Sequence, residues 1–136
     1  MAKNYKLAIT IKERNAQATE AEENDDLKKA IRLYEQNIKE DYADEFAFNR
    51  LMVIYRKQKA YADELRVINR GIEIFRSKME RHLEQSLHRR GNLEKVAQLS
   101  RAILRKSGVK KENLSFPDPI DKWMKRKKIV SEKLRK

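Results

Sequence analysis

Residues 45–78 read EFAFNRLMVIYRKQKAYADELRVINRGIEIFRSK and contain the pattern that decides the fold. In the second half of this stretch, apolar side chains recur at intervals of four, three and four residues, at Tyr61, Leu65, Ile68 and Ile72. The same intervals occur 34 residues earlier, at Leu27, Ile31, Tyr34 and Ile38. This spacing puts the side chains on one face of an α-helix, so the sequence predicts the same amphipathic helix twice.

A further shift, of 32 residues, extends the pattern toward the C-terminus. It superposes Leu51 on Leu83, Tyr55 on Leu87, Tyr61 on Leu93, Val67 on Leu99 and Ile72 on Leu104. A period near 34 residues with two amphipathic helices per unit is typical of a solenoid of helical hairpins. We therefore expect an all-α fold.

Capping residues set the expected helix boundaries. Asn24-Asp25-Asp26 precedes one helix, Gly91-Asn92 precedes another, and Asp118-Pro119 precedes the last. Ser77, with Glu80 three residues later, predicts a capping box that divides the long run after Leu65. We predict helices at about 3–22, 26–41, 44–58, 61–76, 77–90, 92–107 and 119–134.

The first of these helices has a competing interpretation. Apolar residues alternate with polar or small ones at Tyr5, Leu7, Ile9 and Ile11, as they do in a half-buried strand. We favour a helix because the chain offers no partner strand.

The composition agrees with long amphipathic helices. The 136 residues are 40% charged and 40% hydrophobic, with three glycines, two prolines and no cysteine. The start of the chain lacks the apolar core of a signal peptide, and no run is long and apolar enough to span a membrane. Cytoplasm is the expected location.

The net charge of +12 is distributed unevenly. Residues 1–44 carry 8 Lys and Arg against 10 Asp and Glu, whereas residues 105–136 carry 12 against 4. Because a clustered basic surface attracts acidic peptides, nucleic acid or anionic membranes, the gradient indicates a partner rather than a reaction.

The central stretch resembles the tetratricopeptide repeat, and the resemblance extends over about residues 11–108. Phe48, Leu51 and Tyr55 stand at the family's Trp, Leu and Tyr positions of a first helix, and Tyr61 stands at the Tyr of the second helix. Matching positions in the flanking units are Leu27, Ala30, Tyr34 and Ile38 before it, and Leu83, Leu87, Gly91 and Leu93 after it.

The resemblance implies a right-handed superhelical stack of about three antiparallel hairpins in residues 1–108, a linker at 109–118 and a capping helix at 119–136. Four positions depart from the family pattern. Met52 and Lys59 replace small residues, Glu64 replaces an Ala, and Arg76 replaces a Pro.

In such arrays the first helix of each hairpin lines a concave groove that binds peptides. The resemblance therefore implies a protein or acidic-peptide partner and a non-catalytic adaptor. The implied binding residues are Asn49, Arg50, Val53, Arg56, Lys57, Lys78, Arg81, His82, Gln85 and Arg89, with Phe46 and His88 on the same faces. The first-unit positions, which include Thr19, Glu22 and Glu23, are not basic.

The C-terminal helix supports an alternative. Ile120, Trp123, Val130 and Leu134 share a face that suits capping of the last hairpin, although Lys127 interrupts it. The same segment is a basic amphipathic helix, and the second and third units are also basic, so nucleic acid bound by these parts of the chain is the alternative partner. The residues that would bind it are Trp123, Lys125, Arg126, Lys127 and Lys128.

No catalytic constellation or cofactor motif occurs in the sequence. His82 and His88 are six residues apart and point about 120° away from each other on a helix, which is the wrong spacing for a shared metal ion. We therefore expect no enzyme activity, metal or cofactor. The sequence leaves open whether copies of the chain associate.

Overall fold

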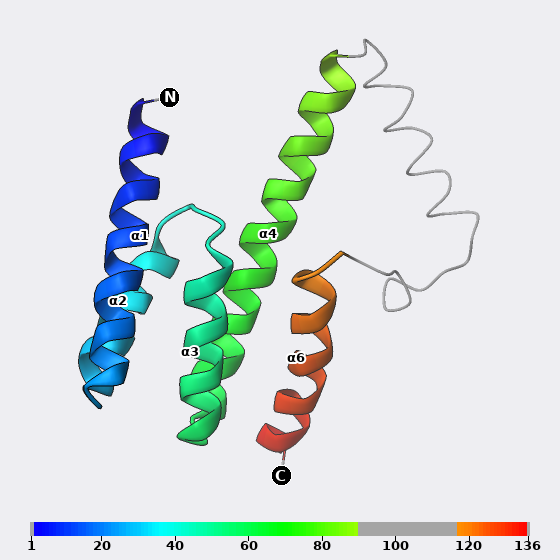
Figure 1. The fold of residues 1–136 in the computed structure, drawn as a ribbon. Coiled ribbons are helices and arrows are strands. Elements are labelled where there is room, and N and C mark those ends of the chain that lie inside the picture. The colour runs from blue at the N-terminus through cyan, green and yellow to red at the C-terminus, as the bar shows by residue number, and fades with distance from the viewer. Residues whose placement is uncertain (1, 90–116, 136) are drawn as a thin grey trace.

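The computed structural model describes residues 2–89 and 117–135, and this part of the chain folds into helices joined by turns. The helices are α1 (Ala2–Glu23), α2 (Leu27–Lys39), α3 (Glu45–Lys57), α4 (Tyr61–Arg89) and α6 (Ile120–Arg135) (Figure 1). No strand occurs among these residues, which confirms the all-α prediction. The helix predicted at 92–107 lies outside the described residues.

Residues 5–11 are helical, so the helix prediction for this segment is confirmed and the strand alternative is wrong. Ile11 is buried. The carbonyl of Ile11 accepts a hydrogen bond at 3.0 Å from the side chain of Asn37, which is itself buried in α2. The apolar alternation near the N-terminus thus belongs to a helix that packs on its neighbour.

Helix α4 runs without a break, so the prediction of separate helices at 61–76 and 77–90 is wrong. A capping residue must leave the helical region of φ and ψ. No proline or other helix breaker near Ser77 makes the chain do so. The carbonyl of Ser77 instead accepts a hydrogen bond at 3.3 Å from the side chain of Arg81 one turn later.

The turns after α1 and α3 have the same hydrogen bonds at positions 34 residues apart. The N–H of Asp26 donates to Ala21 at 2.8 Å, and the N–H of Ala60 donates to Tyr55 at 2.9 Å. One residue earlier, Asp25 and Lys59 have positive φ angles of 60° and 56°. Both helices therefore end in a Schellman turn, although neither turn has the usual glycine.

The helices form two layers. Helix α1 lies in front of α2 and α3 in front of α4, while α6 lies beside α4 (Figure 1). The turns after α1 and α3 and the end of α6 lie at the lower end of Figure 1. The core between the layers is apolar and includes Ala18, Leu33, Phe48, Leu51 and Val67.

A polar cluster joins three successive helices of the stack. The hydroxyl of Tyr55 (α3) donates to Glu35 (α2) at 2.6 Å, and Arg66 (α4) donates to the same carboxylate at 3.2 Å. Burial and the bond to Glu35 raise the pKa of Tyr55. A second cluster of the same composition joins α1, α2 and α3 through Glu22, Tyr34 and Arg50.

Helix α6 is held by Trp123, which is 1% exposed. The indole ring packs against Phe48 and Phe75, with ring centroids 5.6 Å and 5.1 Å away. A Cβ atom at Gly71 would lie 2.9 Å from the ring, so only glycine leaves room for this contact. The indole N–H donates to Asn49 at 2.8 Å, which links α6 to α3.

A buried carboxylate provides a second link. Glu64 is fully buried on α4, and Arg126 of α6 donates to its two oxygens at 2.7 Å and 3.1 Å. Arg56 of α3 lies 3.5 Å from the same carboxylate. Glu64 therefore binds α6 in addition to the contacts made by Trp123.

Candidate functional site

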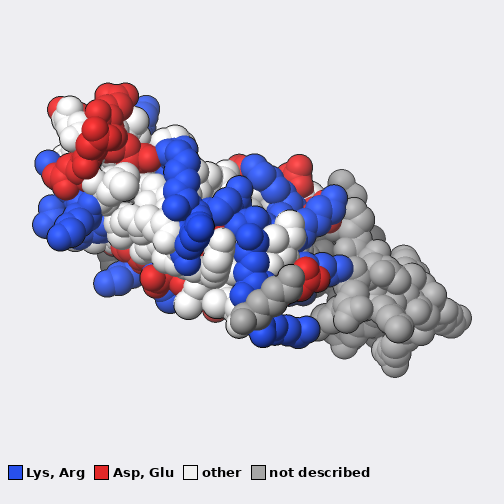
Figure 2. All heavy atoms as spheres, turned by 90° about the horizontal axis from the view of Figure 1, so that it is seen from below, with Lys and Arg blue, Asp and Glu red and all other residues white. Residues whose placement is uncertain are grey.

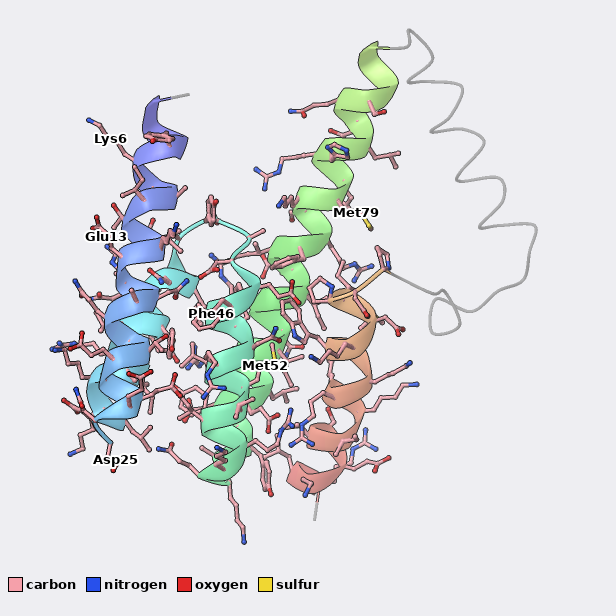
Figure 3. The ribbon with its side chains drawn as sticks, in the orientation of Figure 1. Lys6, Glu13, Asp25, Phe46, Met52 and Met79 are labelled. Atoms are coloured by element: carbon pink, nitrogen blue, oxygen red, sulfur yellow. The ribbon has the colours of Figure 1, made fainter. Side chains whose placement is uncertain are left out.

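An open groove of about 700 Å³ lies between α1 and α3. It runs from Phe46, near the start of α3, to Asp25, in the turn after α1 (Figure 3). Side chains from α1, α2, α3 and their turns form its lining, which comprises Thr19, Glu22, Glu23, Asp25, Leu27, Phe46, Arg50, Ile54, Lys57 and Gln58.

The wall of the groove contains the Glu22 cluster. Tyr34 donates to Glu22 at 2.6 Å, and the Nε of Arg50 donates to the same carboxylate at 3.2 Å. Burial raises the pKa of Glu22, but the hydrogen bonds from Arg50 and Tyr34 outweigh it and hold the pKa below its usual value. Burial and the bond to Glu22 raise the pKa of Tyr34 to about 12. Glu22 is therefore a fixed carboxylate, and Arg50 is already paired.

Apolar side chains are accessible in the same groove. Phe46 is 46% exposed and Leu27 is 40% exposed. The ring of Phe46 is edge-on to Tyr34, with centroids 6.1 Å apart, and this contact holds the ring while much of its surface stays open. Aromatic side chains held in this way are typical anchors in protein interfaces.

The charges around the groove are of both signs. Glu23 and Asp25 are exposed at the end of α1, and Lys57 is exposed at the end of α3. Figure 2, seen from the lower end of the molecule, shows Asp and Glu gathered on one side and Lys and Arg over much of the remainder. The groove is lined by Glu22, Glu23 and Asp25 as well as by Arg50 and Lys57, so it is mixed in charge rather than basic.

Several of the binding residues predicted on α3 form contacts with other residues of the protein. Arg50 is paired with Glu22, Arg56 lies beside Glu64, and Asn49 accepts the indole hydrogen bond. Val53 is half-buried. Lys57 lines the groove and has no ion pair with any described residue.

The binding residues predicted for a third unit lie elsewhere. Phe75 of α4 faces Phe48 of α3, with centroids 6.3 Å apart, so the part of α4 that follows runs past the start of α3. Figure 1 shows this part of α4 extending above α3 and α6. It presents exposed side chains at Lys78, Arg81, His82 and Gln85; the side chains of His88 and Arg89 lie outside the described set. The fold does not bring these residues to Lys57.

The predicted nucleic-acid residues of α6 separate into two groups. Trp123 is buried and Arg126 is bound to Glu64, so both hold the helix in place. Lys125 pairs with Asp121 of its own helix at 3.1 Å, and Lys127 and Lys128 are exposed. Of the predicted residues, a nucleic acid on α6 would therefore meet the exposed lysines, without a stacked indole.

Sequence reasoning missed several residues of the groove, among them Asp25, Leu27 and Ile54. Leu27 was expected on the buried face of α2, but as its first residue it lies at the edge of the layer. The Glu22–Arg50 pair had a usable signal in the sequence, because opposite charges occupy the groove positions that the tetratricopeptide resemblance implies for the first and second units.

Among residues 2–89 and 117–135, no three His, Asp or Glu side chains are grouped to hold a metal ion. Within those same ranges, no helix has the length and apolarity needed to cross a bilayer. Comparison with protein-family models, curated proteins and solved structures gave no match for the chain.

Proposed function

We propose that this protein is a non-catalytic, tetratricopeptide-like adaptor that binds an extended segment of a partner protein in the groove between α1 and α3. The observation that carries the proposal is the exposure of Phe46 and Leu27 inside a concave surface of about 700 Å³. Exposed apolar side chains gathered in a groove and rimmed by charge mark protein interaction sites.

The repeat interpretation is supported by the 34-residue spacing of the first two hairpins. Helices α2 and α4 begin at Leu27 and Tyr61, while α1 and α3 end at Glu23 and Lys57. The turns that follow share their hydrogen bonds position by position. Helices α1 and α3 are the first helices of these hairpins, and in tetratricopeptide arrays the first helices line the binding groove.

The groove favours a segment with an apolar anchor between charges of opposite sign. An aromatic or branched aliphatic side chain would pack on Phe46 and Leu27. An acidic residue would then meet Lys57, and a basic residue would meet Glu23 and Asp25. Because Glu22 and Arg50 neutralise each other, the charges that select the segment are those at the rim.

Selection from a displayed random peptide library on the immobilised protein tests this proposal. Enriched peptides should share an apolar anchor, and Phe46→Ser should weaken their binding by about tenfold or more. Ile129→Ser is the matched control, because Ile129 is also 46% exposed but lies on α6. Equal loss of binding in both variants, or no enrichment, would contradict the proposed site.

A further inference from the structure

We infer that a second groove, between α4 and α6, binds an acidic amphipathic peptide of a partner protein. This site goes beyond the adaptor groove, since it uses different helices at the other end of the stack. It is lined by Ile72, Arg76, Met124, Lys127, Lys128, Ser131, Glu132 and Arg135 and has a volume of about 440 Å³.

The groove is elongated and has an apolar floor. Ile72 is 7% exposed, and Met124 is half-buried beside it. A second hollow of about 340 Å³ shares Ile72 and Lys127 with the first and continues along α4 to Glu80. A helix or extended segment therefore fits better than a small compact ligand. The unbranched Met124 can adjust to different apolar side chains.

The rim of the groove is basic. Lys127, Lys128 and Arg135 are exposed on α6, and the described residues give none of them an ion-pair partner. The lining between α4 and α6 contains one carboxylate, that of Glu132, and the hollow that continues along α4 adds Glu73 and Glu80. The apolar face of α6, formed by Ile120, Trp123 and Val130, is interrupted by Lys127. Core packing does not explain a lysine there, whereas a basic groove edge does.

The apolar floor and the basic rim together indicate which class of molecule binds in the groove. Glutamate or aspartate side chains would pair with the α6 cations, while apolar side chains on the opposite face would cover Ile72 and Met124. A nucleic acid would leave that floor uncovered and find no aromatic ring for stacking, because Trp123 is buried. A flat membrane surface would meet the basic rim but would not reach this recessed apolar floor.

Fluorescence anisotropy of a labelled peptide tests the inference. The probe is an amphipathic helix with leucines on one face and glutamates on the other, added to the full chain. The variant Lys127→Glu/Lys128→Glu should weaken binding by about tenfold or more. The control Lys28→Glu/Lys122→Glu makes the same change in net charge at exposed positions outside the groove and should change affinity less than about threefold. Fluorescence of Trp123 reports whether α6 stays in place.

Further measurements distinguish an acidic amphipathic peptide from other molecules that could bind this groove. A probe with serine in place of leucine should lose most of its affinity, since the floor is apolar. Equal weakening by the two double variants would overturn the site, because it would show attraction by net charge alone. Polyuridylate or phosphatidylserine vesicles that bind as tightly as the peptide, with the same dependence on Lys127 and Lys128, would also overturn it. Phe46→Ser should leave this probe bound, which keeps the test independent of the α1–α3 groove.

Discussion

At the scale of single residues, the contact between Gly71 and Trp123 is the tightest constraint on how α6 packs. We predict that Gly71→Ala lowers the free energy of unfolding by about 1–3 kcal/mol, because the added methyl group overpacks the interface. The overpacking would outweigh a gain of about 1 kcal/mol in helix propensity. Urea unfolding followed by Trp123, the single tryptophan, measures the change.

Asn69→Ala is the control for Gly71→Ala. Asn69 is exposed on the same helix, so its replacement should be neutral or slightly stabilising. In a Trp123→Phe background, where the ring is smaller, Gly71→Ala should lower the free energy of unfolding by less than it does in the unmodified protein. A stabilising effect of Gly71→Ala in the unmodified protein would contradict the packing described for α6.

Glu22 gives the molecule a pH-dependent stability. Its pKa is lower in the folded chain than in the unfolded chain, so it stabilises the fold above its unfolded pKa, and this contribution is lost as the pH falls through the folded pKa. We predict that Glu22→Gln is about 1 kcal/mol less stable than the unmodified protein at neutral pH. The difference should shrink as the pH falls below about 4.

Urea unfolding at neutral and acidic pH measures this difference, with Glu23→Gln as the control. Glu23 is the exposed neighbour of Glu22 and makes no ion pair with a described residue, so its replacement should have little effect at either pH. A Glu22→Gln difference that stays constant with pH would contradict the role of the Arg50 and Tyr34 bonds.

The sequence predicted which side chains share a helix face better than it predicted their partners on other helices. The resemblance to tetratricopeptide repeats implied one groove face for Phe46, Arg50 and Lys57, and all three line the α1–α3 groove. Helical periodicity identifies side chains that share a face. Periodicity does not identify partners on other helices. Glu64 and Arg126 are 62 residues apart, and their pairing depends on where α6 lies.

At the scale of elements, the turns after α1 and α3 are the clearest common feature of the first two hairpins. Each places a charged residue at a positive φ angle, which costs about 1–2 kcal/mol for an L-residue with a Cβ atom. We predict that Lys59→Gly raises the free energy of unfolding by up to about 1 kcal/mol, since glycine adopts this conformation without strain. Denaturant unfolding measures the gain.

Gln58→Gly is the matched control for Lys59→Gly, because Gln58 is adjacent but has a φ of −81°. It should destabilise the protein, since glycine only adds freedom to the unfolded chain there. If the two substitutions shift stability in the same direction, the left-handed conformation of Lys59 is not what distinguishes this turn.

Helix boundaries were predicted well where local chemistry sets them. Asp26 caps α2 by accepting from the N–H of Lys29 at 3.3 Å, as expected from the Asn24-Asp25-Asp26 cluster. The division predicted at Ser77 failed because a capping pattern permits a new helix without requiring one. The stability of α4 depends on what it contacts, and local signals carry no information about that.

In the whole molecule, the charge gradient along the sequence gives a surface with an acidic region and a basic region (Figure 2). The acidic end of α1 and the basic residues of α3 and α6 lie at the same end of the molecule (Figure 2). The sequence did not predict how many of the cations pair with carboxylates inside the molecule. Because of this pairing, the α1–α3 groove presents Phe46, Leu27 and rim charges of both signs rather than a basic face.

Nuclear magnetic resonance titration of the isotope-labelled protein with a library-selected peptide shows which groove binds the peptide. We expect chemical-shift changes concentrated at Thr19, Leu27, Phe46, Ile54 and Lys57, with residues of α6 unchanged. The changes should disappear for Phe46→Ser, whose spectrum should otherwise show an intact fold. Changes concentrated instead at Met124, Lys127 and Lys128, or on the extension of α4 around Arg81, would contradict the α1–α3 groove as the binding site.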